Sequence, residues 1–127
     1  MDVVKKTKVL VVEDSKMALK IAVAILSSFN CEIFSAELGA DAIELVKKHR
    51  FDIIFMDLGL PDMDGLSLSH LIRKMEGDER RTPIVALTAH SEGGLKELGS
   101  LEVLDDYLLK PISTENVGRV LGQFKLV

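Results

Sequence analysis

Short apolar runs of strand length recur along the chain. The first run is continuously apolar, which is typical of a strand in a parallel sheet that helices cover on both faces. The second run alternates more between apolar and polar residues. The runs occupy residues 9–12, 31–36, 51–57, 84–87 and 104–109. They predict five strands.

The segments between these runs carry apolar residues at the 3.6-residue spacing of amphipathic helices. They predict helices over 16–28, from 39 to about 50, from 64 or 65 to about 76, over 91–101, and after Ser113. The predicted core-facing residues are Met17, Ile21, Ala24, Ile25 and Ser28 in the first helix, Leu66, Leu68, Leu71, Ile72 and Met75 in the third, and Val117, Val120, Leu121 and Phe124 in the last. Strands alternating with helices indicate βαβ units, and hence an α/β fold with a parallel sheet between two layers of helices.

The segment 91–101 is the weakest of the predicted helices. It contains Gly93, Gly94 and Gly99, and each glycine in a helix interior costs about 1 kcal/mol relative to alanine. We therefore expect an incomplete helix with high mobility in this segment.

Four of the five predicted strands end at a residue that can take part in chemistry: Glu13 and Asp14 after the first, Asp57 on the third, Thr88 on the fourth and Lys110 on the fifth. In a parallel sheet these ends share one edge, where ligands bind. Carboxylates 4 Å apart near a surface repel by about 4 kcal/mol per pair, so a cation is expected among the three acids. Mg²⁺ suits such oxygen ligands, and Lys110 and Thr88 complement a phosphoryl group on Asp57, the candidate nucleophile.

Composition argues against several other kinds of site. One cysteine and three scattered histidines do not make a Cys/His metal cluster, so any metal must be bound by oxygen. The net charge of -4 and the lack of a basic run argue against direct nucleic-acid binding. No apolar stretch reaches membrane-spanning length, and the N-terminus lacks the pattern of a signal peptide. We expect a single cytoplasmic domain over 1–127, with its core over 8–125.

The residues at the strand ends and the motifs around them resemble a receiver domain of the two-component response-regulator family. The resemblance covers residues 8 to about 125. Its motifs are Glu13-Asp14, Met56-Asp57, Leu60-Pro61-Asp62-Met63-Asp64-Gly65, Thr88-Ala89 and Asp106-Tyr107-Leu108-Leu109-Lys110-Pro111. It implies a flavodoxin-like, doubly wound, five-stranded parallel sheet of order 2-1-3-4-5 with five helices, an order known from this family.

The resemblance also implies a function. Asp57 would accept a phosphoryl group from a phosphohistidine on a histidine kinase or a histidine phosphotransfer protein. Glu13, Asp14, Asp57 and the backbone carbonyl of Gly59 would hold Mg²⁺. Lys110 would pair with a phosphoryl oxygen, and its bond to Pro111 would be cis. The chain would be a signalling domain that catalyses its own phosphorylation and dephosphorylation, and not an enzyme acting on other substrates.

The readout and the partner surface follow from the same resemblance. Thr88 and Tyr107 would change conformation on phosphorylation, and Gly59 and His90 would affect how long the phosphorylated state lasts. Tyr107 as plain packing and His90 as a solvated loop residue remain open alternatives. The first helix would help to form the partner's docking surface, with its two flanks packing on neighbouring helices as the alternative. We expect a monomer or a weak homodimer.

One position departs from the family pattern. Val103 stands where these domains usually have a glycine shortly before the Asp-Tyr pair. Glycine commonly ends a helix in a left-handed conformation that valine resists, so the helix over 91–101 is expected to end early or to be partly unwound.

Three other functions use parts of the same pattern. A haloacid-dehalogenase-like phosphatase would want a second acid two residues after Asp57, where Gly59 stands. A flavodoxin-like cofactor carrier needs a phosphate-binding loop after the first strand, where Glu13-Asp14 would repel the phosphate. A purely structural receiver-like module usually lacks the phosphoacceptor aspartate or the lysine, and this chain has both, as Asp57 and Lys110. We expect either a stand-alone receiver or part of a larger regulator or hybrid histidine kinase. The motifs Leu-Thr-Ala-His and Asp-Asp-Tyr-Leu-Leu-Lys-Pro look more like those of receivers in hybrid histidine kinases.

Overall fold

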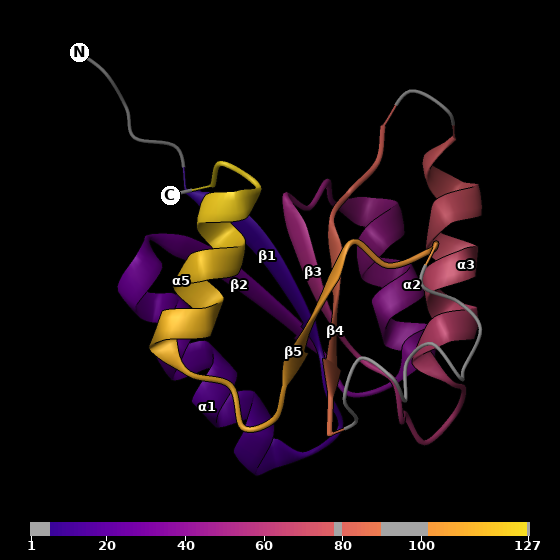
Figure 1. Cartoon of the computed structure of the whole chain (residues 1–127). Helices are drawn as coiled ribbons and strands as arrows, with labels where there is room; N and C mark the ends of the chain where they lie inside the picture. The colour runs from indigo at the N-terminus through magenta and orange to yellow at the C-terminus, as the bar shows by residue number, and fades with distance from the viewer. Residues whose placement is uncertain (1–5, 78–79, 90–101, 127) are drawn as a thin grey trace.

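Five parallel strands form the sheet at the centre of the computed structural model, which describes residues 6–77, 80–89 and 102–126 (Figure 1). The strand order is β2-β1-β3-β4-β5, which confirms the predicted order. The strands are β1 (Thr7–Val12), β2 (Cys31–Ala36), β3 (Ile53–Asp57), β4 (Ile84–Thr88) and β5 (Asp106–Leu109).

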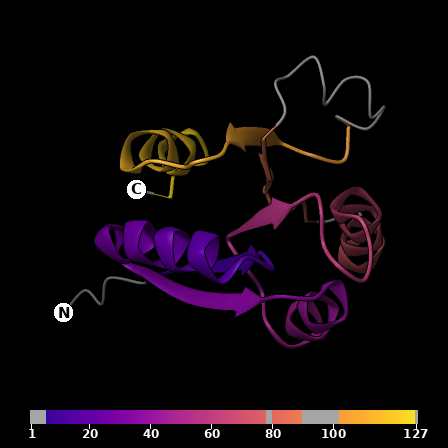
Figure 2. The ribbon, with the colours of Figure 1, turned by 90° about the horizontal axis from the view of Figure 1, so that it is seen from below.

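Helices cover both faces of this sheet. Helices α1 and α5 lie on one face and α2 and α3 on the other (Figure 2). The described helices are α1 (Lys16–Leu26), the short 3₁₀ helix η1 (Ser27–Phe29), α2 (Gly39–Lys48), α3 (Gly65–Glu76) and α5 (Thr114–Gln123). The helix predicted over 91–101, and the mobility predicted for it, lie outside the described residues. Within the described ranges, no helix is long and apolar enough to cross a membrane.

Alternate residues of the central strands point into two separate cores. In β3, Ile54 and Met56 pack toward α2 and α3, whereas Ile53 and Phe55 pack toward α1 and α5. All five residues of β3 are buried. The continuous apolar pattern of these strands follows because both of their faces are covered.

Helix α1 matches its prediction only in part: Ile25 packs against the core as predicted, but the rest of the predicted stripe is exposed. Met17 and Ile21 are 74% and 41% exposed, whereas Ala22 and Leu26 are buried, and the half-buried Leu19 packs with them. Both sides of the helix are apolar and both satisfy helical periodicity. Periodicity alone does not fix how a helix is rotated about its axis, and here packing on the sheet and α5 decides it.

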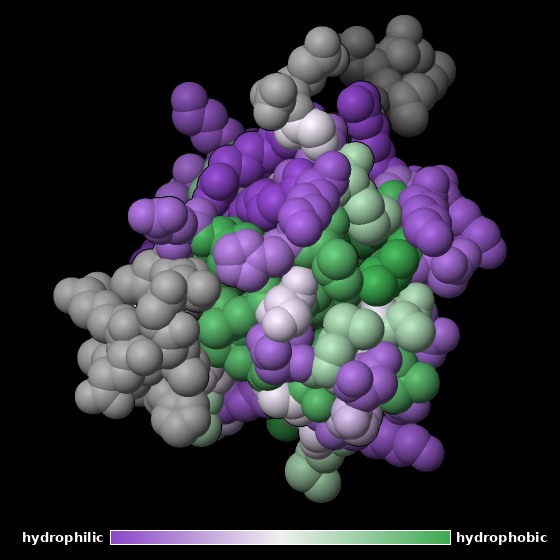
Figure 3. All heavy atoms as spheres, turned by 90° about the vertical axis from the view of Figure 1, so that its right-hand side faces the viewer, coloured by the Kyte–Doolittle hydropathy of each residue, from purple (hydrophilic) through white to green (hydrophobic). Residues whose placement is uncertain are grey.

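Helix α3 also differs in part from its prediction. Leu68 and Ile72 are buried as expected, but Leu71 and Met75 are 41% and 40% exposed. The second buried row contains Ser69, whose hydroxyl donates to the carbonyl of Gly65 at 2.7 Å. Figure 3 looks onto this side of the molecule, where apolar side chains reach the surface among polar ones.

Helix α5 follows its prediction. Val117, Val120 and Leu121 are buried. Its first turn is closed by a capping box, in which the Ser113 hydroxyl accepts from the backbone N–H of Asn116 at 3.2 Å, and the Asn116 side chain accepts from the N–H of Ser113 at 2.8 Å.

Candidate functional site

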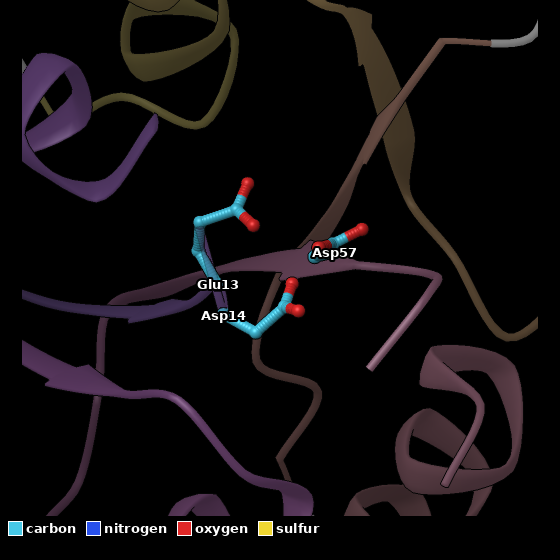
Figure 4. Close-up of side chains that lie close together, drawn as sticks. All are labelled: Glu13, Asp14 and Asp57. Carbon is cyan, nitrogen blue, oxygen red and sulfur yellow. The ribbon is translucent and has the colours of Figure 1, made fainter. Parts of the chain in front are cut away.

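Three carboxyl groups meet at the carboxyl edge of the sheet. Glu13 and Asp14 directly follow β1, and Asp57 is the last residue of β3 (Figure 4). One oxygen from each residue lies within 4.8 Å of the others. Glu13 and Asp57 are buried, being 1% and 7% exposed, whereas Asp14 is exposed. The structure therefore brings together the three acids that the sequence pattern placed on one edge.

Lys110 enters this cluster from the end of β5. Its Nζ lies 2.8 Å from Oε1 of Glu13 and 3.5 Å from Oδ1 of Asp57. The second Glu13 oxygen, Oε2, accepts from the backbone N–H of Ser15 at 3.1 Å. Oε1 is fully buried and has no hydrogen bond of good geometry within the described residues, so the ammonium group is its main compensation. The Lys110–Pro111 peptide bond is cis, which confirms that part of the expectation.

The loop after β3 also contacts Asp57, at the same carboxylate oxygen as Lys110. The backbone N–H of Gly59 donates to Oδ1 of Asp57 at 3.0 Å. The loop returns to the strand at Gly65, whose N–H donates to the carbonyl of Leu58 at 2.9 Å. A Cβ on Gly65 would lie 2.3 Å from the Asp57 carbonyl oxygen, so this close approach needs glycine. At Gly59, by contrast, an added Cβ would meet nothing within 4 Å.

A cavity of about 350 Å³ opens above Asp57. Thr88 lies at its wall, buried at the end of β4, and its carbonyl accepts from the N–H of Lys110 at 2.8 Å. The remaining lining residues are Leu58, Gly59, Leu87, Ala89 and Lys110. Such a space at an acidic, cation-lined sheet edge can admit a small anionic group beside Asp57.

The two other predicted residues of the site are less closely tied to it. Tyr107 lies in β5, paired in register with Ala86, and is half-buried against the α2–α3 core. His90 lies outside the described residues. The roles predicted for both stay predictions.

The charges in the cluster shift one another's protonation. Burial raises the pKa of Asp57, and contact with Glu13 raises it further, whereas the Gly59 N–H and Lys110 act in the opposite direction. Burial lowers the pKa of Lys110, but Glu13 and Asp57 outweigh burial and raise it overall. Lys110 therefore stays charged, and Asp57 holds a proton more tightly than a solvated aspartate does.

The donor set fits a hard divalent cation. The cluster offers carboxylate oxygens from Glu13, Asp14 and Asp57, and the buried Oε1 of Glu13 has Lys110 as its main partner. Mg²⁺ typically takes one or two carboxylates and keeps several waters, and the exposure of Asp14 leaves room for water on that side.

Comparison with known proteins agrees with this geometry. A family model described as the response regulator receiver domain matches residues 9–121. The chain belongs to this receiver domain family. A hybrid signal transduction histidine kinase G from Dictyostelium discoideum is 35% identical over 94% of this chain and 4% of its own length. The histidine-protein kinase BarA from Escherichia coli (strain K12) is 35% identical over 92% of this chain and 13% of its own length.

Solved structures of receiver domains show the same fold. The receiver domain of the sensor histidine kinase PA1611 from Pseudomonas aeruginosa PAO1 has a TM-score of 0.81 and 32% identity, over 94% of this chain and 98% of that one. That structure has a magnesium ion coordinated in its active site cleft. The chemotaxis protein CheY4 of Vibrio cholerae has a TM-score of 0.84 and 29% identity, over 94% and 99%. By contrast, the chain spans only 4% and 13% of the lengths of histidine kinase G and BarA.

The structure also adds contacts that the sequence did not indicate. The Ser15 hydroxyl caps α1 while its N–H binds Glu13, so one residue fixes both the helix and the acid. Asp62 accepts two hydrogen bonds from the start of α2. The contact of Ser15 with Glu13 and those of Asp62 with α2 depend on how the chain folds back, so local sequence patterns do not indicate them.

Proposed function

We propose that this receiver domain accepts a phosphoryl group from a phosphohistidine of a histidine kinase or histidine phosphotransfer protein onto Asp57. The observation that carries the proposal is the cavity above Asp57, which Lys110 and Thr88 line and which adjoins two further acids. An Asp57 oxygen attacks phosphorus as the phosphorus–nitrogen bond breaks. The imidazole nitrogen keeps the bonding electron pair and takes up a proton.

The residues around Asp57 supply positioning and charge, which dominate phosphoryl-transfer catalysis. The Gly59 N–H fixes the Asp57 carboxylate, with Oδ1 3.0 Å away. Lys110, now 2.8 Å from Glu13, is the cation that pairs with a phosphoryl oxygen. Thr88 donates its hydroxyl to another oxygen of the same group.

Mg²⁺ is the proposed cofactor. Glu13, Asp14, Asp57 and the carbonyl of Gly59 would hold it, and when bound it neutralises charge on the acids and on the phosphoryl oxygens. The fit is supported by the three carboxylate oxygens within 4.8 Å of one another and by the buried Oε1 of Glu13.

The same site is proposed to control the signal. The new charge on Asp57 draws Thr88 inward, and the half-buried Tyr107 follows to a more buried position, shifting the population between two conformers. Gly59 leaves open space beside the phosphoryl group, which admits water for self-catalysed hydrolysis, and His90 modulates that step. We further propose that residues 1–127 form one such domain.

The partner is proposed to dock beside the site, on the exposed side of α1. An apolar groove of about 330 Å³ runs there from Glu13 and Lys110. Its apolar lining includes Met17, Ile21 and Ile112, and the exposed Met17 and Ile21 contribute little to the core. A helix that presents a phosphohistidine would lie in this groove with its imidazole next to Asp57.

Phosphorylation is tested with Mg²⁺ and a small acyl-phosphate donor, followed by intact-mass measurement. The native chain should gain one phosphoryl group and Asp57→Ala none. Failure of both chains to react, or reaction of both, overturns the assignment of Asp57.

Docking is tested by phosphotransfer from a phosphorylated histidine phosphotransfer protein. Ile21→Asp should slow transfer strongly, whereas Leu71→Asp is the matched control, since both residues are 41% exposed and Leu71 lies on α3. Both variants should react normally with the small donor, because it needs no docking helix. Equal transfer rates for the two variants would contradict the α1 surface.

A further inference from the structure

Helix α2 begins without a capping side chain of its own. Its N-cap residue is Leu38, with φ -121° and ψ 149°, and a leucine side chain accepts no hydrogen bond. The described helices α1, α3 and α5 all begin at a side chain that does: Ser15, Asp64 and Ser113. The exposed N–H groups at a helix start need an acceptor, so α2 must find one elsewhere.

Asp62 provides this acceptor from the loop between β3 and α3. Its Oδ1 accepts from the N–H of Gly39 at 2.9 Å and its Oδ2 accepts from the N–H of Ala40 at 3.1 Å. These hydrogen bonds, the one from Gly39 first, lower the pKa of Asp62. The carboxylate is therefore charged at neutral pH and lies at the positive end of the helix dipole.

The loop that carries Asp62 is the loop that carries Gly59. Gly59 contacts Asp57 at one end of it and pairs with Asp64 at the other through an isolated antiparallel bridge. Beside Asp62, Met63 packs so closely on Gly39 that a Cβ there would lie 2.6 Å from Met63 side-chain atoms. The tip of the loop is thus attached to α2 by two hydrogen bonds and one tight apolar contact.

We propose that Asp62 is a positioning residue, which fixes the β3–α3 loop to the start of α2 and so holds the Gly59 backbone in the place where its carbonyl would serve as a ligand. This inference rests on the proposed function, in which that carbonyl is a Mg²⁺ ligand. Asp62 does not touch the cation or the phosphoryl group. It acts through the loop backbone, as outer partners of metal ligands do.

The test is Mg²⁺ binding to the whole chain by isothermal titration calorimetry at 0.15 M salt. Asp62→Ala should weaken binding about tenfold, the lower end of the usual effect of removing a partner of a metal ligand. Val46→Ala is the matched control, because it removes packing at the far end of the same helix and leaves the Asp62 contacts intact. Val46→Ala should lower the thermal midpoint with no change in Mg²⁺ affinity.

A second variant separates positioning from simple capping. Leu38 already has the extended backbone of an N-cap residue, so Leu38→Ser in the Asp62→Ala background should cap α2 locally and restore its stability. Mg²⁺ affinity should stay low in this double variant, because the loop still lacks its hydrogen bonds to the start of α2. If affinity returns together with stability, Asp62 is only a cap and the inference is wrong.

Asp62→Asn separates the effect of the hydrogen bonds to α2 from the effect of the negative charge. The asparagine side chain is neutral, as alanine is, but it keeps one acceptor oxygen, so the Mg²⁺ affinity of Asp62→Asn should lie between that of Asp62→Ala and that of the native chain. Identical affinities of the two variants would assign the effect to charge alone and overturn the positioning role. If the native chain itself neither binds Mg²⁺ nor accepts phosphate, the proposed function fails; if it does both and Asp62→Ala binds Mg²⁺ equally well, only this inference fails.

Discussion

Replacing Asp57 with asparagine should stabilise the protein in the absence of divalent cations. In an effective dielectric of about 20, two unit charges 4.8 Å apart repel by about 3.5 kcal/mol, and Asp57 faces two such acids within that distance. Lys110, 3.5 Å away, attracts Asp57 by about 4.7 kcal/mol on the same scale. The net repulsion is about 2 kcal/mol. The neutral side chain of Asp57→Asn would escape this repulsion while keeping an acceptor oxygen for the Gly59 N–H.

Thermal or urea unfolding followed by circular dichroism measures this effect. In EDTA at neutral pH, Asp57→Asn should raise the free energy of unfolding by about 2 kcal/mol, or the midpoint by about 7 °C. Added Mg²⁺ should stabilise the native chain more than the variant, because the variant offers one charged ligand fewer. The control is Asp52→Asn at the opposite edge of the sheet, where the carboxylate accepts from the N–H of Lys8 at 2.7 Å and lies outside the acidic cluster.

The pH dependence gives the sharpest check. The folded-state pKa of Asp57 lies above its unfolded value, because burial and Glu13 disfavour its charged form. The folded chain therefore holds this proton more tightly, and that advantage is lost as pH rises through the folded-state pKa. The gain from Asp57→Asn should thus disappear below about pH 4, where the unfolded carboxyl is protonated too. An Asp57→Asn chain that is no more stable than the native chain at neutral pH in EDTA would refute the electrostatic reasoning.

Two further changes should destabilise the chain in ways that unfolding titrations can measure. Gly65→Ala places a Cβ 2.3 Å from the Asp57 carbonyl oxygen, so it should lower the free energy of unfolding by about 3 kcal/mol and slow phosphorylation of Asp57. A near-native free energy of unfolding would show that the loop is not tightly fixed. Arg73→Ala removes a side chain that is 16% exposed and bonds to Asp105 at 2.7 Å, so it should cost about 3 kcal/mol. Arg81→Ala, at a site 53% exposed, should cost less than about 1 kcal/mol. Equal losses of unfolding free energy in the two arginine variants would contradict the expectation that the more buried ion pair contributes more.

The sequence alone determined the five strands, the described helices and the edge of the sheet at which the functional side chains gather. The run that becomes β3 is apolar throughout and ends in Asp57, and both properties follow from neighbouring residues. The same holds for the Ser113 cap of α5 and for the parallel strand order, which the alternation of strands and helices and the family motifs indicate together. Local patterns record such features because they reflect the chemistry of a few adjacent residues.

The tertiary structure decided which contacts join these elements. It showed that α1 buries Ala22 and Leu26 instead of Met17 and Ile21, which frees an apolar surface beside the site. It placed Lys110 closer to Glu13 than to Asp57, and it joined the β3–α3 loop to the start of α2, more than twenty residues earlier in the chain. Such contacts depend on the rotation of each helix and on distances between chain segments far apart in sequence, and periodicity along the chain carries neither quantity.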